Sequence, residues 1–180
     1  QARNYGIGGT RIARQRIPSA ETKYDLDFCS RCQEMDPDAD IVIVFGGTND
    51  FGHGDAAFGK FTDRTNDTFY GAYHLLLQQL IDQYPNAKLV VMTPMHRLSE
   101  DEDVYNELGI RRMGKLVRYV DAIKEIAGFY GVACVDLFCQ CPIQPKVDIL
   151  RQKYMPDGIH PNDVGHTLLA DCLLSKLNEV

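Results

Sequence analysis

The 180-residue sequence has no excess of positive charge, no long hydrophobic run and no internal repeat or linker. Lys and Arg number 19 against 25 Asp and Glu, which gives a formal net charge of -6 and a pI of about 5.3. Proteins that bind nucleic acid or an anionic membrane surface need a positive face, so this balance argues against both classes. No apolar stretch approaches the roughly 18 residues of a membrane span, so no membrane-spanning segment is expected.

The sequence also lacks an initiator Met, and its first residues do not resemble a signal peptide. We interpret it as a sequence that starts within a longer chain, so its first residues carry no information on localisation. The six cysteines include the pairs Cys29 and Cys32, and Cys139 and Cys141, whose spacing is found in zinc sites. The alternative is reduced cysteines in or near the core of a cytosolic protein, because chains of this size rarely need disulfides.

Short apolar runs alternate with amphipathic stretches, a pattern typical of βαβ units and a parallel sheet. The pattern predicts strands at residues 41–45, 88–93 and 132–136, the first of them buried on both faces. It predicts helices at residues 27–35, 68–84 and 110–130, and a last helix that begins near Asp163 with Asn162 or Asp163 as its N-cap. We expect a single α/β domain over residues 1–180.

Residues 4–12 have the composition of a strand that ends in a Gly-rich turn. Parallel strands need crossovers of about a dozen residues, and nothing before Asn4 can supply one, so we expect the sheet to lack at least one strand. Long loops are expected at residues 46–67, 94–109 and 137–162. Such loops at the carboxyl edge of a parallel sheet are where these folds bind ligands.

A first candidate for chemistry is the segment from Asp157 to Asn162, which contains Gly158 and His160. A histidine in a loop before a helix can serve as a general base near neutral pH. It needs an acceptor that fixes its tautomer, and a turn through Gly158 could bring the Asp157 carboxylate beside the ring. The alternative is an Asp-Gly turn before a capped helix, with His160 merely exposed.

A second candidate follows the first predicted strand, where Gly46 and Gly47 precede Thr48, Asn49 and Asp50. The Asn49 amide is a neutral hydrogen-bond donor at a strand end, where an oxyanion donor belongs. The alternative is a common Gly-Asn-Asp turn.

A third candidate is the glycine turn at Gly6, Gly8 and Gly9. It superficially resembles a dinucleotide-binding pattern, but its spacing is incomplete and no acidic residue follows about 20 positions later at the end of a second strand. The better interpretation is a backbone N–H, that of Gly9, that points into a site; the alternative is a plain turn.

Together these segments resemble the SGNH hydrolases, also called GDSL esterases and lipases. Asn4, Gly6 and Gly9 match the family's Asn-x-Gly-x-x-Gly block, and Gly47 to Asp50 match its Gly-x-Asn-Asp block. Asp157, His160 and Pro161 match its Asp-x-x-His-Pro block. Order, spacing and placement after predicted strands all agree over essentially the whole chain.

The resemblance implies a three-layer, flavodoxin-like α/β/α fold with about five parallel strands. It implies cleavage of acyl esters, lipids, acetylated sugars or thioesters as small-molecule substrates, with neither metal nor organic cofactor. His160 would be the general base and Asp157 its partner, while the Gly9 N–H and the Asn49 side chain would bind the oxyanion. Gly47, Thr48, Asp50 and His96 are the residues that we expect near the substrate.

The chain departs from the family in one block, because the Gly-Asp-Ser that carries the nucleophile is absent. None of its four serines follows Gly-Asp: Ser19, Ser30, Ser99 and Ser175. We therefore expect the nucleophile in a segment upstream of residue 1, and small esters such as acetylated carbohydrates as substrates. The alternatives are a non-catalytic domain of this type that binds acylated ligands, and a flavodoxin-like nucleotide-binding protein.

Overall fold

A computed structural model describes residues 1–102 and 114–179 of the chain. These residues form two compact units. The first unit contains residues 1–42 and 46–89, and the second contains residues 43–45, 90–102 and 114–179. The expected single domain stays a prediction, and the two units are described one after the other.

The sheet has three strands in the order β1 (Ile41–Phe45), β2 (Lys88–Met92) and β3 (Ala133–Val135). β2 and β3 are parallel, with Val90 opposite Ala133 and Met92 opposite Val135. All three predicted strands are thus confirmed to within one residue at either end. The described residues supply fewer strands than the five or so implied by the family resemblance.

β1 differs from its prediction because only one of its faces is buried. Val42 and Val44 are buried, whereas Ile41, Ile43 and Phe45 are 46%, 44% and 41% exposed. The prediction of two buried faces rested on the run of apolar side chains. It was wrong because the described residues cover only the face that carries Val42 and Val44 and leave the other face exposed.

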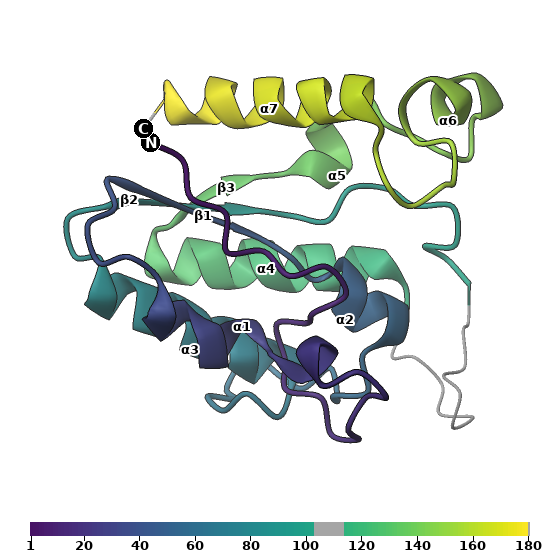
Figure 1. The fold of residues 1–180 in the computed structure, drawn as a ribbon. Coiled ribbons are helices and arrows are strands. Elements are labelled where there is room, and N and C mark those ends of the chain that lie inside the picture. Colours follow the sequence, from purple (N-terminus) through teal and green to yellow (C-terminus); the bar gives the residue numbers. More distant parts are fainter. Residues whose placement is uncertain (103–113, 180) are drawn as a thin grey trace. The chain divides into compact units, whose positions relative to one another are not determined.

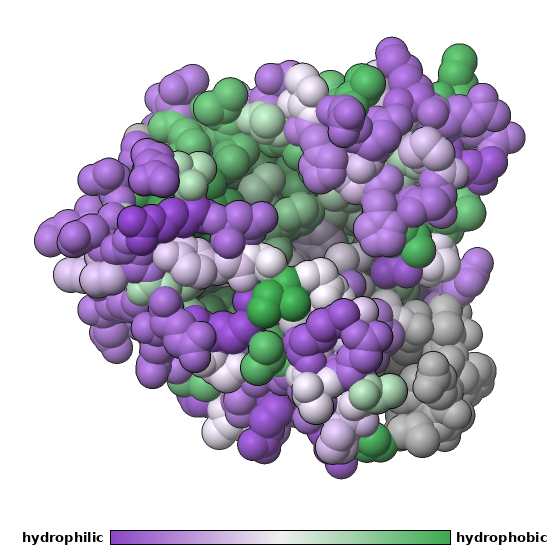
Figure 2. All heavy atoms as spheres, viewed as in Figure 1, coloured by the Kyte–Doolittle hydropathy of each residue, from purple (hydrophilic) through white to green (hydrophobic). Residues whose placement is uncertain are grey.

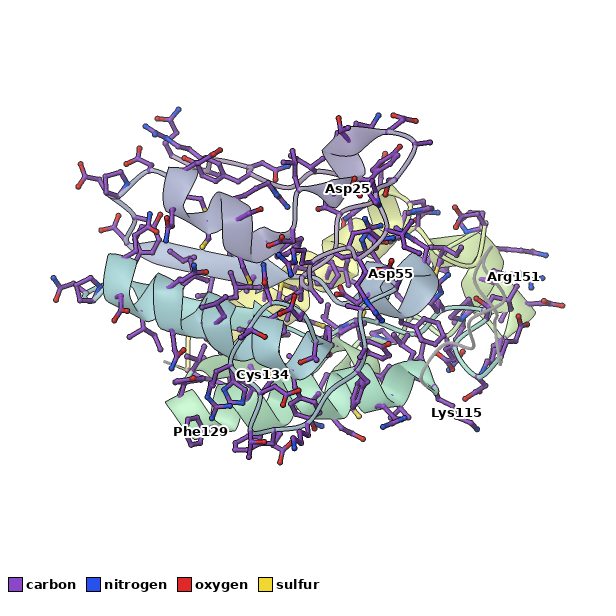
Figure 3. The ribbon with its side chains drawn as sticks, turned by 90° about the horizontal axis from the view of Figure 1, so that it is seen from below. Asp25, Asp55, Lys115, Phe129, Cys134 and Arg151 are labelled. Atoms are coloured by element: carbon purple, nitrogen blue, oxygen red, sulfur yellow. The ribbon has the colours of Figure 1, made fainter. Side chains whose placement is uncertain are left out.

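Two long helices of the second unit contact β3, namely α4 (Leu116–Tyr130) and α7 (Asp163–Leu177). They lie on opposite sides of that strand (Figure 1). α4 begins later than predicted, because Gly114 has a φ of +96° and Lys115 is extended; residues 110–113 lie outside the described part. Lys115 and Phe129 mark its two ends (Figure 3). A left-handed Gly131 ends it, as glycine commonly does.

α7 begins where the sequence predicts. The Asn162 side chain caps it by accepting a hydrogen bond of 3.0 Å from the backbone nitrogen of Gly165. Leu169 is buried in the core of this unit, and the other predicted inward residues pack against that core: Leu168, Cys172, Leu173 and Leu177. Val164 and Leu174 are exposed, and hydrophobic residues appear among hydrophilic ones in this region (Figure 2).

Short helices occupy parts of the segments predicted as long loops. In the second unit these are α5 (Leu137–Gln140) and α6 (Asp148–Tyr154), and both contact α7. In the first unit it is α2 (Thr48–His53). The loops are therefore long connections with local helical order, and the residues they carry have defined positions.

The first unit also contains η1 (Thr22–Asp25), α1 (Phe28–Arg31), η2 (Cys32–Glu34) and α3 (Phe69–Gln83). α1 and η2 fill the helix predicted at 27–35 and both contact α3, which matches the helix predicted at 68–84. All six cysteines are free. Within residues 1–102 and 114–179, no cluster of His, Cys, Asp and Glu could hold a metal ion, and no helix could span a membrane.

Candidate active site

The Asp157 carboxylate and the His160 ring are joined within one tight turn of the second unit. Asp157 Oδ2 lies 2.7 Å from His160 Nδ1, and Asp157 Oδ1 accepts hydrogen bonds from the backbone nitrogens of Ile159 at 2.9 Å and His160 at 2.7 Å. These donors, the backbone N–H of His160 first, lower the pKa of Asp157 to about 2. The ionised carboxylate can only accept, so the ring carries hydrogen at Nδ1. Nε2 then has the lone pair that a general base needs.

Gly158 makes this turn possible. Its φ is +77°, and a Cβ at this position would lie 2.8 Å from the Cβ of Leu98. Its carbonyl accepts a 2.8 Å hydrogen bond from the backbone nitrogen of Leu98. This hydrogen bond joins the turn that carries Asp157 and His160, here called the dyad, to the loop after β2. The His160 side chain remains 79% exposed, which a base that must reach a substrate requires.

Asn49 lies in the first turn of α2 in the first unit. Gly47, at φ +101°, turns the chain into this helix, so Thr48, Asn49 and Asp50 are helical and not the open loop that the sequence suggested. Asn49 Nδ2 donates a 2.9 Å hydrogen bond to the carbonyl of Thr10. An amide nitrogen carries two hydrogens, so this bond orients the group and leaves the second hydrogen for a ligand.

Gly9 precedes the residue to which Asn49 is bonded. Its φ is +82°, and a Cβ here would lie 2.7 Å from the ring of Tyr24, so only glycine fits. The Thr10 backbone nitrogen and hydroxyl both donate to the Ile7 carbonyl, at 3.3 and 2.8 Å. The two predicted oxyanion donors therefore belong to one local arrangement in the first unit.

Asp50 is buried and holds the segment that follows this turn. Its carboxylate accepts hydrogen bonds from the backbone nitrogens of Ile12 at 3.0 Å and Ala13 at 2.9 Å. Burial raises the pKa of Asp50 to about 6, opposed by these two N–H groups. Because the Asp50 oxygens accept hydrogen bonds from the backbone of Ile12 and Ala13, we expect Asp50 to position the oxyanion donors by fixing the chain beside them.

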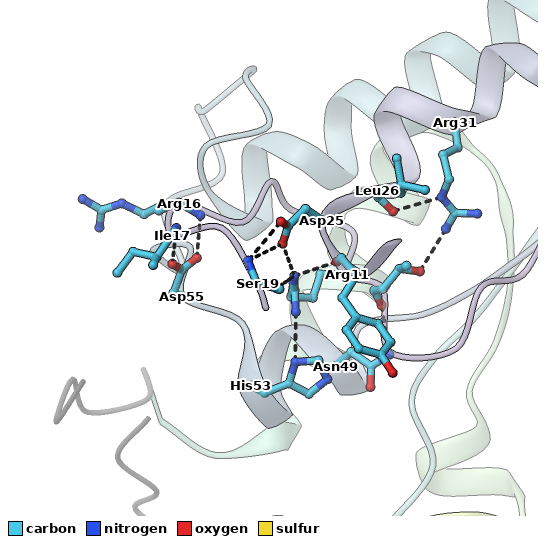
Figure 4. A network of polar contacts seen from close by, with 12 residues as sticks. Arg11, Arg16, Ile17, Ser19, Asp25, Leu26, Arg31, Asn49, His53 and Asp55 are labelled. Carbon is cyan, nitrogen blue, oxygen red and sulfur yellow. Dashed lines mark hydrogen bonds and ion pairs between the residues drawn. The ribbon is translucent and has the colours of Figure 1, made fainter. Parts of the chain in front are cut away.

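The structure also contains a network of polar contacts around the buried Arg11, which was not predicted from the sequence (Figure 4). Arg11 Nη1 lies 3.0 Å from His53 Nδ1, and Nη2 donates to the Tyr24 carbonyl at 2.6 Å and reaches Asp25 at 3.4 Å. Arginine can only donate, so His53 Nδ1 accepts and the ring hydrogen lies on Nε2. A lone Arg between a glycine turn and an apolar Ile carries no periodic signal that could have predicted this.

The predicted site residues thus fall into two sets. Gly9, Gly47, Thr48, Asn49 and Asp50 belong to the first unit, where Asn49 donates to Thr10 and Asp50 accepts from Ile12 and Ala13, so that α2 is joined to residues 10–13. The second set, His96, Asp157 and His160, belongs to the second unit. His96 Nδ1 lies 2.8 Å from the buried Glu100.

Residues 1–168 match the GDSL-like Lipase/Acylhydrolase family. A GDSL lipase of Mycobacterium tuberculosis is 28% identical over 138 residues, which is 76% of this chain and 49% of that protein. The chain therefore spans about half the length of this curated relative.

Solved structures with a similar fold include a protein from Lactobacillus plantarum, with 30% identity, a TM-score of 0.82, and coverage of 98% of this chain and 80% of that one. An acetyl xylan esterase is 23% identical with a TM-score of 0.58, over 94% of this chain and 77% of that one, a likeness in fold alone. These comparisons confirm the predicted flavodoxin-like α/β fold.

Proposed function

This chain belongs to the GDSL-like lipase/acylhydrolase family, and from that premise we propose that it carries the base and oxyanion donors of a serine esterase. The observation that carries the proposal is the hydrogen bond between Asp157 Oδ2 and His160 Nδ1, with His160 exposed. The proposed substrates are small acyl esters, with acetylated carbohydrates as the first candidates.

The nucleophile in this proposal is the serine of a Gly-Asp-Ser segment upstream of residue 1. Two serines of the chain have structural hydrogen bonds. Ser19 Oγ accepts from Arg11, and Ser30 Oγ donates to the Asp27 carbonyl. Ser175 lies within α7, and neither it nor Ser99 follows Gly-Asp.

In the proposed reaction His160 Nε2 takes the proton of the serine hydroxyl while the serine oxygen attacks the ester carbonyl. The Gly9 N–H, the Asn49 amide and the serine N–H stabilise the oxyanion. His160 then protonates the leaving alcohol. Water, with its proton taken by His160, next attacks the acyl-enzyme, and His160 returns that proton to the serine oxygen as the acid is released.

The test uses the full-length protein with any upstream segment. A fluorophosphonate should label the upstream serine covalently, and His160→Ala should abolish labelling. His166→Ala, an exposed histidine on α7, is the matched control and should label like the wild type. p-Nitrophenyl esters of rising acyl chain length should be cleaved fastest when the acyl group is short.

A second function, a non-catalytic domain that binds acylated ligands, predicts a different outcome. Saturable binding of an acetylated sugar without turnover or labelling would support it and would contradict the esterase. An intact mass equal to residues 1–180 alone on active, folded protein would contradict the upstream serine.

A further inference from the structure

A second histidine–carboxylate pair lies on the loop after β2, in the same unit as the Asp157–His160 dyad. Glu100 is only 5% exposed, and its Oε2 lies 2.8 Å from His96 Nδ1 and accepts a 3.1 Å hydrogen bond from the Arg97 backbone nitrogen. Its Oε1 lies 2.9 Å from Lys146 Nζ. Three donors therefore hold this buried carboxylate, which would not be stable there as an isolated charge.

These contacts fix which atom of His96 can bind something else. The Glu100 carboxylate, which also contacts Lys146, accepts from Nδ1, so in the neutral form of the ring the lone pair is on Nε2. The other contact of His96 among the described residues is the Phe138 ring, whose centroid lies 3.8 Å from that of the imidazole. Neither contact uses Nε2, and the His96 side chain is 21% exposed.

The His96–Glu100 pair lies on the loop after β2, the same loop that is hydrogen-bonded to the turn of the Asp157–His160 dyad. The Leu98 backbone nitrogen donates to the Gly158 carbonyl at 2.8 Å. His96 comes two residues before Leu98, and His160 comes two residues after Gly158. The segment around Leu98 is therefore held both by Glu100, through His96 and Arg97, and by the turn of the dyad, through Gly158.

We infer that His96 is a specificity-determining residue, whose Nε2 accepts a hydrogen bond from a hydroxyl group that the substrate carries close to its ester. The inference rests on the proposed esterase function and names its substrate class, esters of polyhydroxylated alcohols. A site built to accept a hydrogen bond discriminates against an analogue without the donor, because the acceptor loses its water and gains no partner.

The experiment compares glycerol 1-acetate with propyl acetate, two acetates that differ in the hydroxyl groups of the alcohol. The full-length wild type should favour the hydroxylated ester in kcat/KM by about tenfold or more. His96→Asn places an amide donor near the position of Nδ1, where it can still bind Glu100, and removes Nε2. It should lower kcat/KM for glycerol acetate by about 10-fold and leave propyl acetate within about twofold.

His96→Gln is the matched variant, because its amide reaches the position of Nε2, and it should retain most of the preference. Equal kcat/KM of the wild type for the two acetates would overturn the inference, even if the variants failed to fold. An equal loss on both esters in His96→Asn would overturn it too, and would indicate a positioning role. A wild type that cleaves neither acetate and resists the fluorophosphonate would overturn the esterase proposal itself.

Discussion

Asp157 binds His160 twice, once at the ring nitrogen Nδ1 and once at the backbone nitrogen, both at 2.7 Å. The backbone bond sets the turn, and the ring bond sets the tautomer. One carboxylate thus fixes both where the imidazole lies and which of its nitrogens can accept a proton.

Asp157→Asn should separate these two effects. Asparagine can still accept from the backbone nitrogens of Ile159 and His160, but its NH₂ would face Nδ1 and favour the tautomer with hydrogen on Nε2. We expect kcat on p-nitrophenyl acetate to fall by about 10⁴ with little change in melting temperature. Asp163→Asn, in the first turn of α7, is the control. A variant at position 157 with near-normal kcat would remove Asp157 from the mechanism.

Asn49→Ala removes one proposed oxyanion donor and its hydrogen bond to the Thr10 carbonyl. Loss of such a donor should lower kcat by about 10²–10³, and loss of the bond should cost about 1 kcal/mol of stability. Steady-state kinetics and urea unfolding measure the two effects separately. If stability falls while kcat does not, Asn49 is structural only.

Gly9→Ala should be harmful, and Gly8→Ala next to it should not. A side chain at position 9 meets a φ of +82° and the Tyr24 ring at 2.7 Å, whereas a Cβ at Gly8 has no neighbour within 4 Å. The left-handed backbone alone costs about 1–2 kcal/mol. We expect lower kcat and a lower melting temperature for Gly9→Ala alone. Equal effects of the two substitutions would show that the turn is not built around Gly9.

The stability of the fold should depend on the protonation of Asp50. Its pKa rises from 3.8 to about 6 on folding, so the folded state holds this proton more tightly than the unfolded state. The stabilising contribution is complete below pH about 4, is lost as pH rises to about 6, and changes no further above; two pKa units correspond to about 3 kcal/mol.

Urea unfolding at pH 4 to 7 on wild type and Asp50→Asn measures this contribution as a difference in slope. Asp38→Asn, which removes an exposed carboxylate, should keep the wild-type slope. A wild type and an Asp50→Asn variant with parallel pH profiles would contradict the prediction.

Periodicity and capping chemistry predicted much of the fold. α7 begins at the cap expected from Asn162, because a side-chain acceptor before an apolar stripe is a local signal, and α3 begins within one residue of its predicted start. The Asp157–His160 pair was also predictable, since the Asp-Gly-x-His spacing confines both side chains to one turn.

The remaining features depend on contacts between residues far apart in the sequence. The exposed face of β1 depends on what packs over it, which the strand's own apolar run does not encode. Arg11 and His53 are 42 residues apart, and Glu100 meets Lys146 only after α4 and β3 have intervened. The helical start at Gly47 depends on a left-handed φ, where a Gly-Asn-Asp composition equally suits a turn.

The uncovered side chains of Ile41, Ile43 and Phe45 also bear on how a preparation of residues 1–180 behaves. Apolar surface in water attracts other apolar surface, and this attraction weakens on cooling and strengthens in sulfate. Such a preparation should stay clear longest when cold, dilute and free of sulfate, and crystallisation trials should begin with polyethylene glycols in place of ammonium sulfate.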